Sequence, residues 1–277
     1  MRKIFSFFVA VMVVSSLSAK SIYLHVNDDW KSFGAVFFVH SWGGAGDADV
    51  KLALVEGEEY LFTAEIPDDN NSLVFVRAQG ESQSIPWGTG DLWNKTTDLG
   101  IPDDGKDCFY LVGWTDGKWL SHGDSPAISI VGNFPGEGTW GPDAHPMTIA
   151  ADKASASVTF ALEKGTYEMK VWLEGFYLSL NGEGDTKYQI NRDWNHADNV
   201  NTVNNNGRNF EFVADQTGDY TFTWTFASQN LVVAFPELPT AVETIQTEGK
   251  SVKRIVNGEL RIIRDGKTFN ALGAEVR

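Results

Sequence analysis

Short apolar segments recur along the whole chain, and none has the length and period of an ordinary helix. Segments such as SIYLHV, GAVFFVH and EYLFTAEI are rich in β-branched and aromatic residues and are separated by Gly, Asp, Asn or Pro. The pattern restarts after DSPA with ISIVGNF and runs on to NLVVAF. Because no segment keeps a helical period, the sequence predicts an all-β chain built of β-sandwiches.

The restart of the strand pattern divides the chain into modules. A boundary at Gly123–Pro126 gives two halves of about a hundred residues, the usual size of a single sandwich. We therefore predict two immunoglobulin-like β-sandwich modules in tandem, over residues 21–123 and 127–236. Residues 237–250 contain Pro, Thr and Glu without a period and are predicted to be a linker. Two hairpin signals, Asn257-Gly258 and Asp265-Gly266, predict a short β-hairpin tail over 251–277.

The N-terminus has the three parts of a secretory signal peptide. Arg2 and Lys3 precede the apolar run Ile4–Val14, and the small residues of Ser15–Ala19 follow. The apolar run is too short to cross a bilayer as a mature helix. We interpret residues 1–19 as a signal peptide cut near Ser18 or Ala19, with an N-terminal core helix as the weaker alternative.

Charge and cysteine content exclude several function classes. The chain has 37 acidic and 22 basic residues and a net charge of −15, which argues against nucleic acids and anionic membranes as partners. The one cysteine, Cys108, cannot form an internal disulfide. It lies in the strand-like run KDCFYLVGW, where we expect it to act as a small buried hydrophobic residue.

The sequence holds no catalytic or metal-binding motif. Its adjacent acidic pairs lie beside Asn, Gly or Pro, where Asp favours turns: Asp28-Asp29, Asp68-Asp69 and Asp103-Asp104. The five histidines are scattered, and neither a Gly-x-Ser-x-Gly turn nor a phosphate-binding loop occurs. Since no residues fill the roles of nucleophile, base and orienting group, we expect no catalysis, no metal and no cofactor.

Tryptophan is unusually frequent, with ten residues, and several lie in polar loops. A protein that holds a sugar without cutting it needs aromatic faces for the C–H surface and polar groups for the hydroxyls. The loops LWNKTTD and INRDWNHADN have that composition, although Trp also plugs the ends of sandwiches. In SIPWGTGDLWNKTTDL, we take Trp93, next to Asn94 and Lys95, as a ligand contact. Trp87, after Pro86, is taken as a plug that holds the loop against the sheet.

Residues 21–122 resemble the family-26 starch-binding modules of Bacteroidetes surface proteins. The resemblance lies in IYLHVNDDWKSFGAVFFVHSW, SLVFVRAQG and WGTGDLWNKTTDLGIPDDGKDCFYLVGW, and in the closing GKW. The chain departs from the family at three places. Lys95-Thr96 stands where the family has Gln-Thr, DADVKL replaces a segment with a Trp, and Phe37 and Phe38 stand where Tyr is usual.

Residues 127–235 resemble the early-set sandwiches that bind glycogen and starch, including modules of Bacteroidetes starch-utilisation lipoproteins. The matching pieces are ISIVGNF with Trp140, Pro146-Met147, GTYEMKV, Trp194 and TGDYTFTWTFASQNLVVAF. This resemblance implies Trp140, Lys170 and Trp194 as sugar contacts. Asn205 and Arg208 lie in a polar loop and are candidate partners for sugar hydroxyls, with a solvated loop as the alternative.

The tail resembles the C-terminal segments of secreted Bacteroidetes proteins through NGELRI and FNALG. That resemblance implies sorting or surface delivery, and an ordinary β-appendage is the alternative. Together these features predict a non-catalytic protein that binds α-glucans such as starch, with an outer-membrane polysaccharide-utilisation complex as a partner. The expected location is outside a Gram-negative cell or on its surface, with the periplasm as the alternative. A second hypothesis is a cell-surface or matrix interaction protein that uses the same folds without binding sugar.

Overall fold

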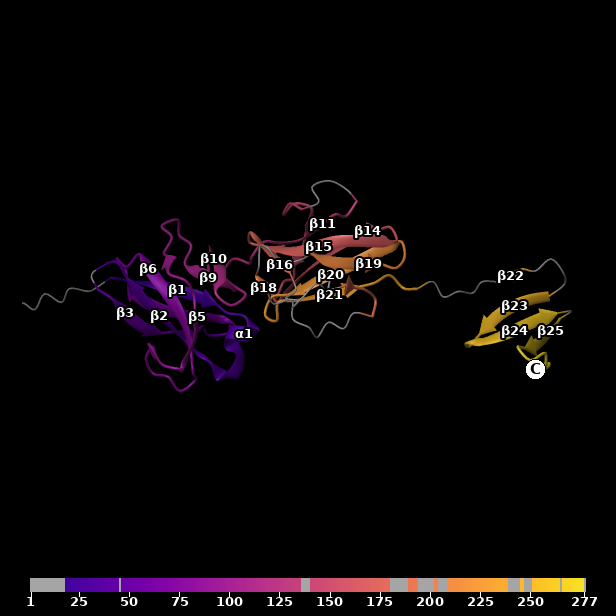
Figure 1. Cartoon of the computed structure of the whole chain (residues 1–277), viewed down its shortest axis with the longest axis horizontal. Helices are drawn as coiled ribbons and strands as arrows, with labels where there is room; N and C mark the ends of the chain where they lie inside the picture. The colour runs from indigo at the N-terminus through magenta and orange to yellow at the C-terminus, as the bar shows by residue number, and fades with distance from the viewer. Residues whose placement is uncertain are drawn as a thin grey trace, which may run out of the picture. The chain divides into compact units, whose positions relative to one another are not determined.

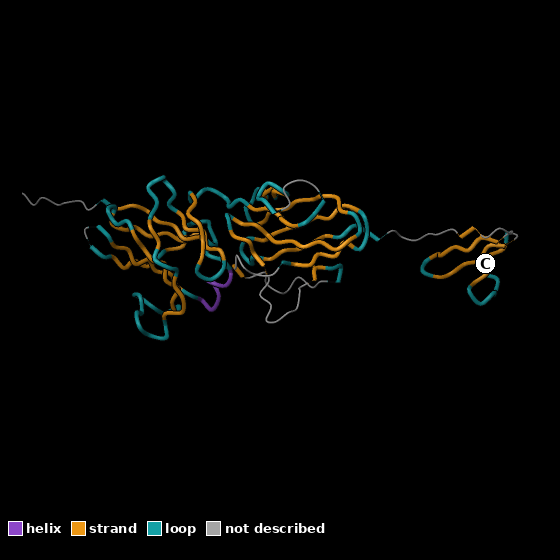
Figure 2. Tube along the Cα trace, turned by 45° about the horizontal axis from the view of Figure 1, so that its top comes forward, coloured by secondary structure: helices purple, strands orange, loops and turns teal. Residues whose placement is uncertain are grey.

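The computed structural model describes residues 18–44, 46–135, 140–179, 189–193, 202–203, 209–238, 245–246, 251–264 and 266–276. The regular secondary structure of these residues is nearly all β-strand, as predicted, with loops and turns between the strands (Figures 1 and 2). The α-helix of the described residues is the single turn α1 (Asp28–Lys31). No helix among them is long and apolar enough to span a membrane. The chain divides into two compact units, residues 1–235 and 236–277.

The first sandwich packs two sheets face to face. One sheet has the order β10-β9-β1-β5-β4 and contains β1 (Ala19–His25), β4 (Ala53–Leu54), β5 (Leu61–Pro67), β9 (Cys108–Val112) and β10 (Asp116–Leu120). The other has the order β3-β2-β6-β7, with β8 also pairing with β6. It contains β2 (Val36–Trp42), β3 (Ala48–Lys51), β6 (Ser72–Ala78), β7 (Leu92–Lys95) and β8 (Leu99–Gly100). Alternate residues of both sheets, such as Leu24, Phe37 and Phe75, fill one core.

Trp30 anchors the connection between the two sheets of the first sandwich. Its side chain is fully buried, and its indole Nε1 donates to the Trp114 carbonyl at 2.6 Å. The Asn27 side chain caps α1 by accepting a hydrogen bond from the Trp30 amide at 3.0 Å. The 3₁₀ turn η1 (Ser32–Gly34) follows and turns the chain into β2. Trp30 therefore serves as a packing anchor of this turn.

The second sandwich also has two sheets. The larger sheet has the order β12-β11-β15-β16-β18, with β19 between β15 and β17. It contains β11 (Ile128–Gly132), β12 (His145–Pro146), β15 (Gly165–Leu173), β16 (Phe176–Ser179), β17 (Gln189–Ile190), β18 (Thr202–Val203) and β19 (Phe210–Ala214). The smaller has the order β13-β14-β20-β21 and contains β13 (Thr148–Ile149), β14 (Ser155–Leu162), β20 (Gly218–Thr225) and β21 (Asn230–Ala234). Tyr220, Phe222 and Trp224 alternate into the core along β20.

The two sandwiches are joined by packing as well as by the chain. Tyr110 and Val112 on β9 belong to the hydrophobic core of the second sandwich. The Asp28 amide donates to the Ala227 carbonyl at 2.9 Å, and Lys153 Nζ donates to the Gly123 carbonyl at 2.7 Å. These contacts lie within the first compact unit, so the junction is part of its folded structure.

The second compact unit is a small antiparallel sheet. Its strand order is β22-β23-β24-β25, with β22 (Ile245–Gln246), β23 (Ser251–Val256), β24 (Glu259–Arg264) and β25 (Lys267–Asn270). Asn257 and Gly258 have φ values of 54° and 79°, which fits the two-residue hairpin predicted there. Strand β22 lies inside the stretch predicted to be a linker. Residues 1–17, which contain most of the predicted signal peptide, lie outside the described residues.

Candidate functional site

An open groove of about 290 Å³ crosses the outer face of the first sandwich. We call it the tryptophan groove, and it is lined by His40, Trp42, Val74, Trp87, Lys95 and Asp98. His40 and Trp42 come from β2, and Val74 and Lys95 come from the neighbouring strands β6 and β7. Of the sequence-predicted contacts that lie within the described residues, Lys95 is the one that lines this groove.

The rings of the groove are held by one another and by Asp49. His40 stacks on Trp42, with ring centroids 5.2 Å apart and planes 29° apart. Trp87 meets His40 edge to face at 5.6 Å and 83°, so the two indole planes are steeply inclined to each other. His40 Nδ1 lies 2.7 Å from Asp49 Oδ1 on the adjacent strand β3, which fixes the imidazole at the centre of the cluster.

The loop that carries Trp87 is fastened to the sheet by Ile85. Ile85 is 6% exposed and packs with Phe38, Val76 and Ala78 on the outer face of the sheet. Trp87 keeps 45% of its surface exposed. The prediction that Trp87 plugs the loop is therefore wrong: the smaller Ile85 fills that place, and the indole is left at the side of the groove.

Trp93 lies apart from Lys95, although only one residue separates them. The pairing of β6 with β7 shifts register between Arg77 and Ala78, opposite Trp93. The Arg77 guanidinium carbon is 4.8 Å from the Trp93 ring centroid and 6.0 Å from that of Trp114. Trp93 is 37% exposed, so one surface of the ring packs on Arg77 and part of the rest faces solvent.

Arg77 is fixed under these two tryptophans by backbone oxygens. It is 5% exposed, and Nε donates to the Trp30 carbonyl at 2.7 Å while Nη2 donates to the Ser32 carbonyl at 3.0 Å. Burial lowers the pKa of Arg77. The Trp93–Arg77–Trp114 stack is thus a rigid surface beside α1, separate from the tryptophan groove.

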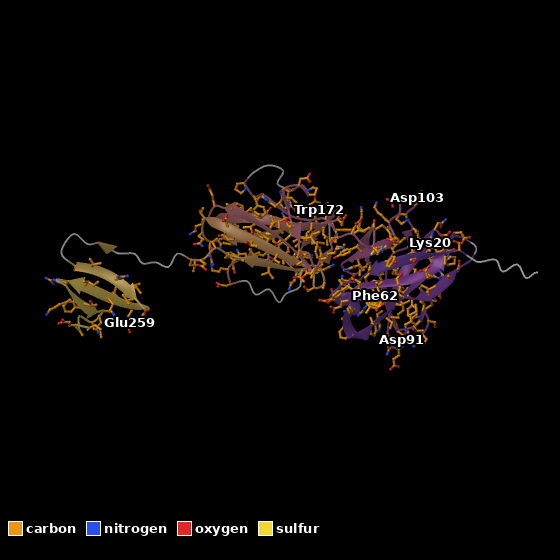
Figure 3. All side chains as sticks on the ribbon, turned by 180° about the vertical axis from the view of Figure 1, so that it is seen from behind. Lys20, Phe62, Asp91, Asp103, Trp172 and Glu259 are labelled. Carbon is orange, nitrogen blue, oxygen red and sulfur yellow. The ribbon has the colours of Figure 1, made fainter. Side chains whose placement is uncertain are left out.

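The predicted contacts of the second sandwich are only partly within the described residues. Trp172, which is labelled in Figure 3, lies on β15 and pairs with Tyr177 on β16. Tyr177 Oη donates to the carbonyl of Trp140, which lies in a turn, at 3.1 Å. Lys170 lies on β15 with only 6% exposure, and burial lowers the pKa of its ammonium. Little of Lys170 is therefore left for a ligand to contact. Trp194, Asn205 and Arg208 lie outside the described residues.

The described residues offer no grouping suited to a metal ion. No cluster of three or more His, Cys, Asp or Glu side chains occurs among them. Cys108 is buried, as expected, and burial raises the pKa of its thiol to about 12. The thiol is therefore protonated at neutral pH and is a poor nucleophile.

Comparison with protein-family models, with curated proteins and with solved structures finds no match for this chain. The starch-binding resemblance of the sequence therefore stays a prediction. The groove residues His40, Trp42 and Asp98 were not singled out by sequence reasoning. Trp42 was the available signal, since it ends an apolar strand next to Gly43-Gly44.

Proposed function

We propose that the chain is a non-catalytic carbohydrate-binding protein and that its first sandwich holds the glycan in the tryptophan groove. One observation carries the proposal. Two indole rings, the half-buried Trp42 and the exposed Trp87, line the same open groove as Lys95 and Asp98. Apolar ring faces next to a few polar groups are the combination that a sugar ring, with C–H faces and a rim of hydroxyls, requires.

The inclination of the rings favours a curved glycan over a flat one. A straight, ribbon-like chain stacks on rings that lie in one plane, whereas Trp42 and Trp87 present surfaces at a steep angle. Successive residues of a helical α-glucan turn their faces along the chain, so both indoles can contact sugar at once. Lys95 is suited to donate hydrogen bonds to hydroxyl oxygens, and Asp98 is suited to accept from hydroxyl groups. The resemblance of residues 21–122 to starch-binding modules supports the same class of ligand.

We also propose a cellular location and a partner for the protein. The signal-peptide pattern of residues 1–19 and the resemblance of residues 251–277 to sorting segments support export to the cell surface. A surface location fits delivery of captured glucan to an outer-membrane polysaccharide-utilisation complex. The second sandwich is proposed to add a weaker site through Trp140 and Trp194, and two linked sites would gain avidity on a long polymer.

Affinity electrophoresis tests this function. The chain is run through native gels that contain amylopectin, a β-glucan, or no polysaccharide. We expect amylopectin to retard the chain and the β-glucan to leave its migration unchanged. Trp87→Ala removes one stacking face, and we expect it to weaken the retardation roughly tenfold. Its effect on the free energy of unfolding is expected to be small, about 1 kcal/mol or less, because Trp87 is 45% exposed.

Trp114→Ala is the matched control, because Trp114 is 47% exposed and lies outside the groove. It should migrate as the unmodified chain does. Unretarded migration of the unmodified chain in every polysaccharide gel would refute the carbohydrate-binding proposal and leave the interaction-protein hypothesis. Equal retardation of the unmodified chain and Trp87→Ala would move the site away from the groove. Release of reducing ends from amylopectin would contradict the absence of catalysis.

A further inference from the structure

A cavity of about 320 Å³ lies between the two sandwiches of the first compact unit. The first sandwich lines it with His25 on β1, Tyr60 in the turn before β5, and Tyr110 on β9. Phe226 and Ala227, which follow β20, line it from the second sandwich. It shares no lining residue with the tryptophan groove.

The walls of the cavity are held in place by contacts of the chain itself. Tyr110 and its neighbour Val112 pack into the core of the second sandwich, and the Asp28 amide bonds the Ala227 carbonyl at 2.9 Å. Tyr60 Oη donates to Asp28 Oδ1 at 2.8 Å, which ties the turn before β5 to the same point. The cavity therefore exists without a ligand, as most small-molecule sites do.

Two polar side chains at the cavity have no side-chain hydrogen bond to the described residues. Tyr110 is 5% exposed, and among the described residues none hydrogen-bonds its hydroxyl. No described residue hydrogen-bonds either ring nitrogen of His25. His25 contacts its neighbours through ring stacking. His25 is only half-buried, and neither its nitrogens nor Tyr110 Oη is among the fully enclosed, unbonded side-chain atoms of the described residues. These polar atoms are therefore open to the cavity, where a molecule from solution can hydrogen-bond them. Burial lowers the pKa of His25 to about 4, so at neutral pH its ring offers one donor and one acceptor.

Ring faces of His25, Tyr60 and Tyr110 are covered by neighbouring groups of the chain. His25 stacks on Tyr110 at 4.6 Å and 19° and lies 6.3 Å from Tyr60 with planes 23° apart. Lys31 Nζ covers Tyr60 at 4.2 Å from the ring centroid. An organic cation binds open aromatic faces, and those of His25 and Tyr60 are covered. The edges of the rings, with their hydroxyl and imidazole groups, are what remains for a ligand.

The mouth of the cavity is acidic. Four exposed carboxylates line it: Glu58, Glu59, Asp124 and Asp152. Glu59 is paired with Lys31 at 2.8 Å, and the ammonium of Lys153 donates to the Gly123 carbonyl at 2.7 Å. An anion would be repelled by these carboxylates, whereas a hydroxyl group can donate a hydrogen bond to them. The mouth and the interior thus both favour a ligand that donates and accepts hydrogen bonds without carrying a negative charge.

We propose that this cavity is a second ligand site, separate from the tryptophan groove, and that it binds a neutral, hydroxyl-rich molecule of mono- or disaccharide size. Its volume lies at the lower end of the range of about 300–1,000 Å³ for small-molecule pockets, which limits the ligand to that size. The ligand hydrogen-bonds Tyr110 Oη and a ring nitrogen of His25 and contacts both sandwiches. The polymer proposed for the groove does not fit this space.

Titration of the full chain with glucose and maltose, followed by NMR, tests the proposal. Backbone amide signals of His25, Tyr110 and Ala227 report on the cavity, and the indole N–H signal of Trp87 reports on the groove. We expect saturable shifts of the cavity signals with at least one of the two sugars. Tyr110→Phe keeps the ring and removes the hydroxyl, and we expect it to weaken cavity binding between about twofold and tenfold. His25→Phe keeps a ring beside the tyrosines and removes both nitrogens, with a loss at least as large.

Tyr23→Phe is the matched control, because Tyr23 stacks on His122 at 4.3 Å and does not line the cavity. Its affinity should equal that of the unmodified chain. Cavity signals that stay unchanged up to 100 mM of both sugars would overturn the proposal, and so would full affinity in Tyr110→Phe. Shifts with glucosamine or glucuronic acid, but with neither neutral sugar, would overturn the ligand class.

The two proposals fail separately. Trp87→Ala should abolish the indole signal and weaken amylopectin retention while leaving the cavity titration intact. Loss of the cavity shifts in Trp87→Ala would mean that they report groove binding, and would overturn the second site.

Discussion

Acidification should destabilise the first compact unit through His25. The pKa of His25 is lowered by burial from 6.5 to about 4, because the charged imidazolium loses hydration between Tyr60 and Tyr110. Between these two pH values the unfolded chain binds a proton that the folded chain does not. The stabilisation from a neutral His25 is therefore fully present above about pH 6.5 and is lost as the pH falls towards 4.

The size of the effect follows from the two pKa values. One pKa unit corresponds to 1.36 kcal/mol, so the loss is about 2 kcal/mol between pH 7 and pH 5 and about 3 kcal/mol by pH 4. The carboxylates of Glu58, Glu59, Asp124 and Asp152 line the same cavity and favour the imidazolium, which reduces the loss, whereas the ammonium of Lys153 opposes it. His122 also lines the cavity and is retained in every variant compared below.

Urea unfolding at a series of pH values measures this loss. His25→Phe keeps the ring stack and cannot take up the proton, so the difference between the two proteins isolates His25 from the other titrating groups. That group includes His145, whose pKa is also lowered by burial. We expect the free energy of unfolding of the unmodified chain, minus that of His25→Phe, to fall by about 3 kcal/mol from pH 7 to pH 4. A difference that is constant with pH would refute the argument, as would an NMR titration of His25 in the folded chain near pH 6.5.

Two further substitutions, with a third for comparison, test local structure near α1. Phe33 is 89% exposed with φ of 60°, so Phe33→Gly removes a left-handed strain of about 1–2 kcal/mol against a glycine entropy cost of about 0.5–1 kcal/mol. A melting temperature that rises would agree with this balance, and a fall would show that the Phe33 side chain contributes packing. Asn27 caps α1 and donates to the Gly113 carbonyl at 2.8 Å, so Asn27→Ala should cost about 2 kcal/mol in urea unfolding. Asn94→Ala removes an exposed bond of 2.9 Å to the Trp114 carbonyl and should cost less than half as much.

The strands were the most predictable part of the fold. In YTFTWTF the residues Tyr220, Phe222 and Trp224 share one parity, and all three are fully buried while the threonines between them are partly exposed. Period-two alternation is a local signal, so it survives without knowledge of the rest of the chain. The hairpin at Asn257-Gly258 was predictable for the same reason, because its positive φ values are a property of those two residues.

The groove was less predictable, because it depends on which parity of a strand faces the core. In β2 both parities are apolar: Phe37 and Val39 enter the first core, and Phe38 is buried under the covering loop. The sequence alone does not assign His40 and Trp42 to the outer face. The separation of Trp93 from Lys95 depends on the register shift beside Arg77. That shift arises from the pairing of two strands, so the residues around Trp93 do not predict it.

The junction between the sandwiches has a clearer signal in the sequence. The run CFYLV is buried at every position, so β9 has apolar side chains on both of its faces. A strand at the surface of an isolated sandwich would alternate, and a continuous apolar run indicates cover on the outer face as well. Phe109 and Leu111 face the first core, and Tyr110 and Val112 face the second. A boundary drawn from turn residues at 123–126 is compatible with this run, but the run also predicts that the two modules pack on each other.

Packing alone does not account for what lies beside that run. If β1 and β9 had only to bury surface at the junction, Leu or Phe at positions 25 and 110 would do so without placing polar atoms where no described residue bonds them. His25 and Tyr110 are paired in register on β1 and β9, and both line one cavity. Their polar atoms have lost part of their hydration there. A ligand that hydrogen-bonds both groups offsets the cost, and it does so only in the folded junction. The pH titration and the sugar titration therefore share one reporter, the imidazole of His25. A neutral sugar that binds the neutral imidazole should lower the pKa of His25 further.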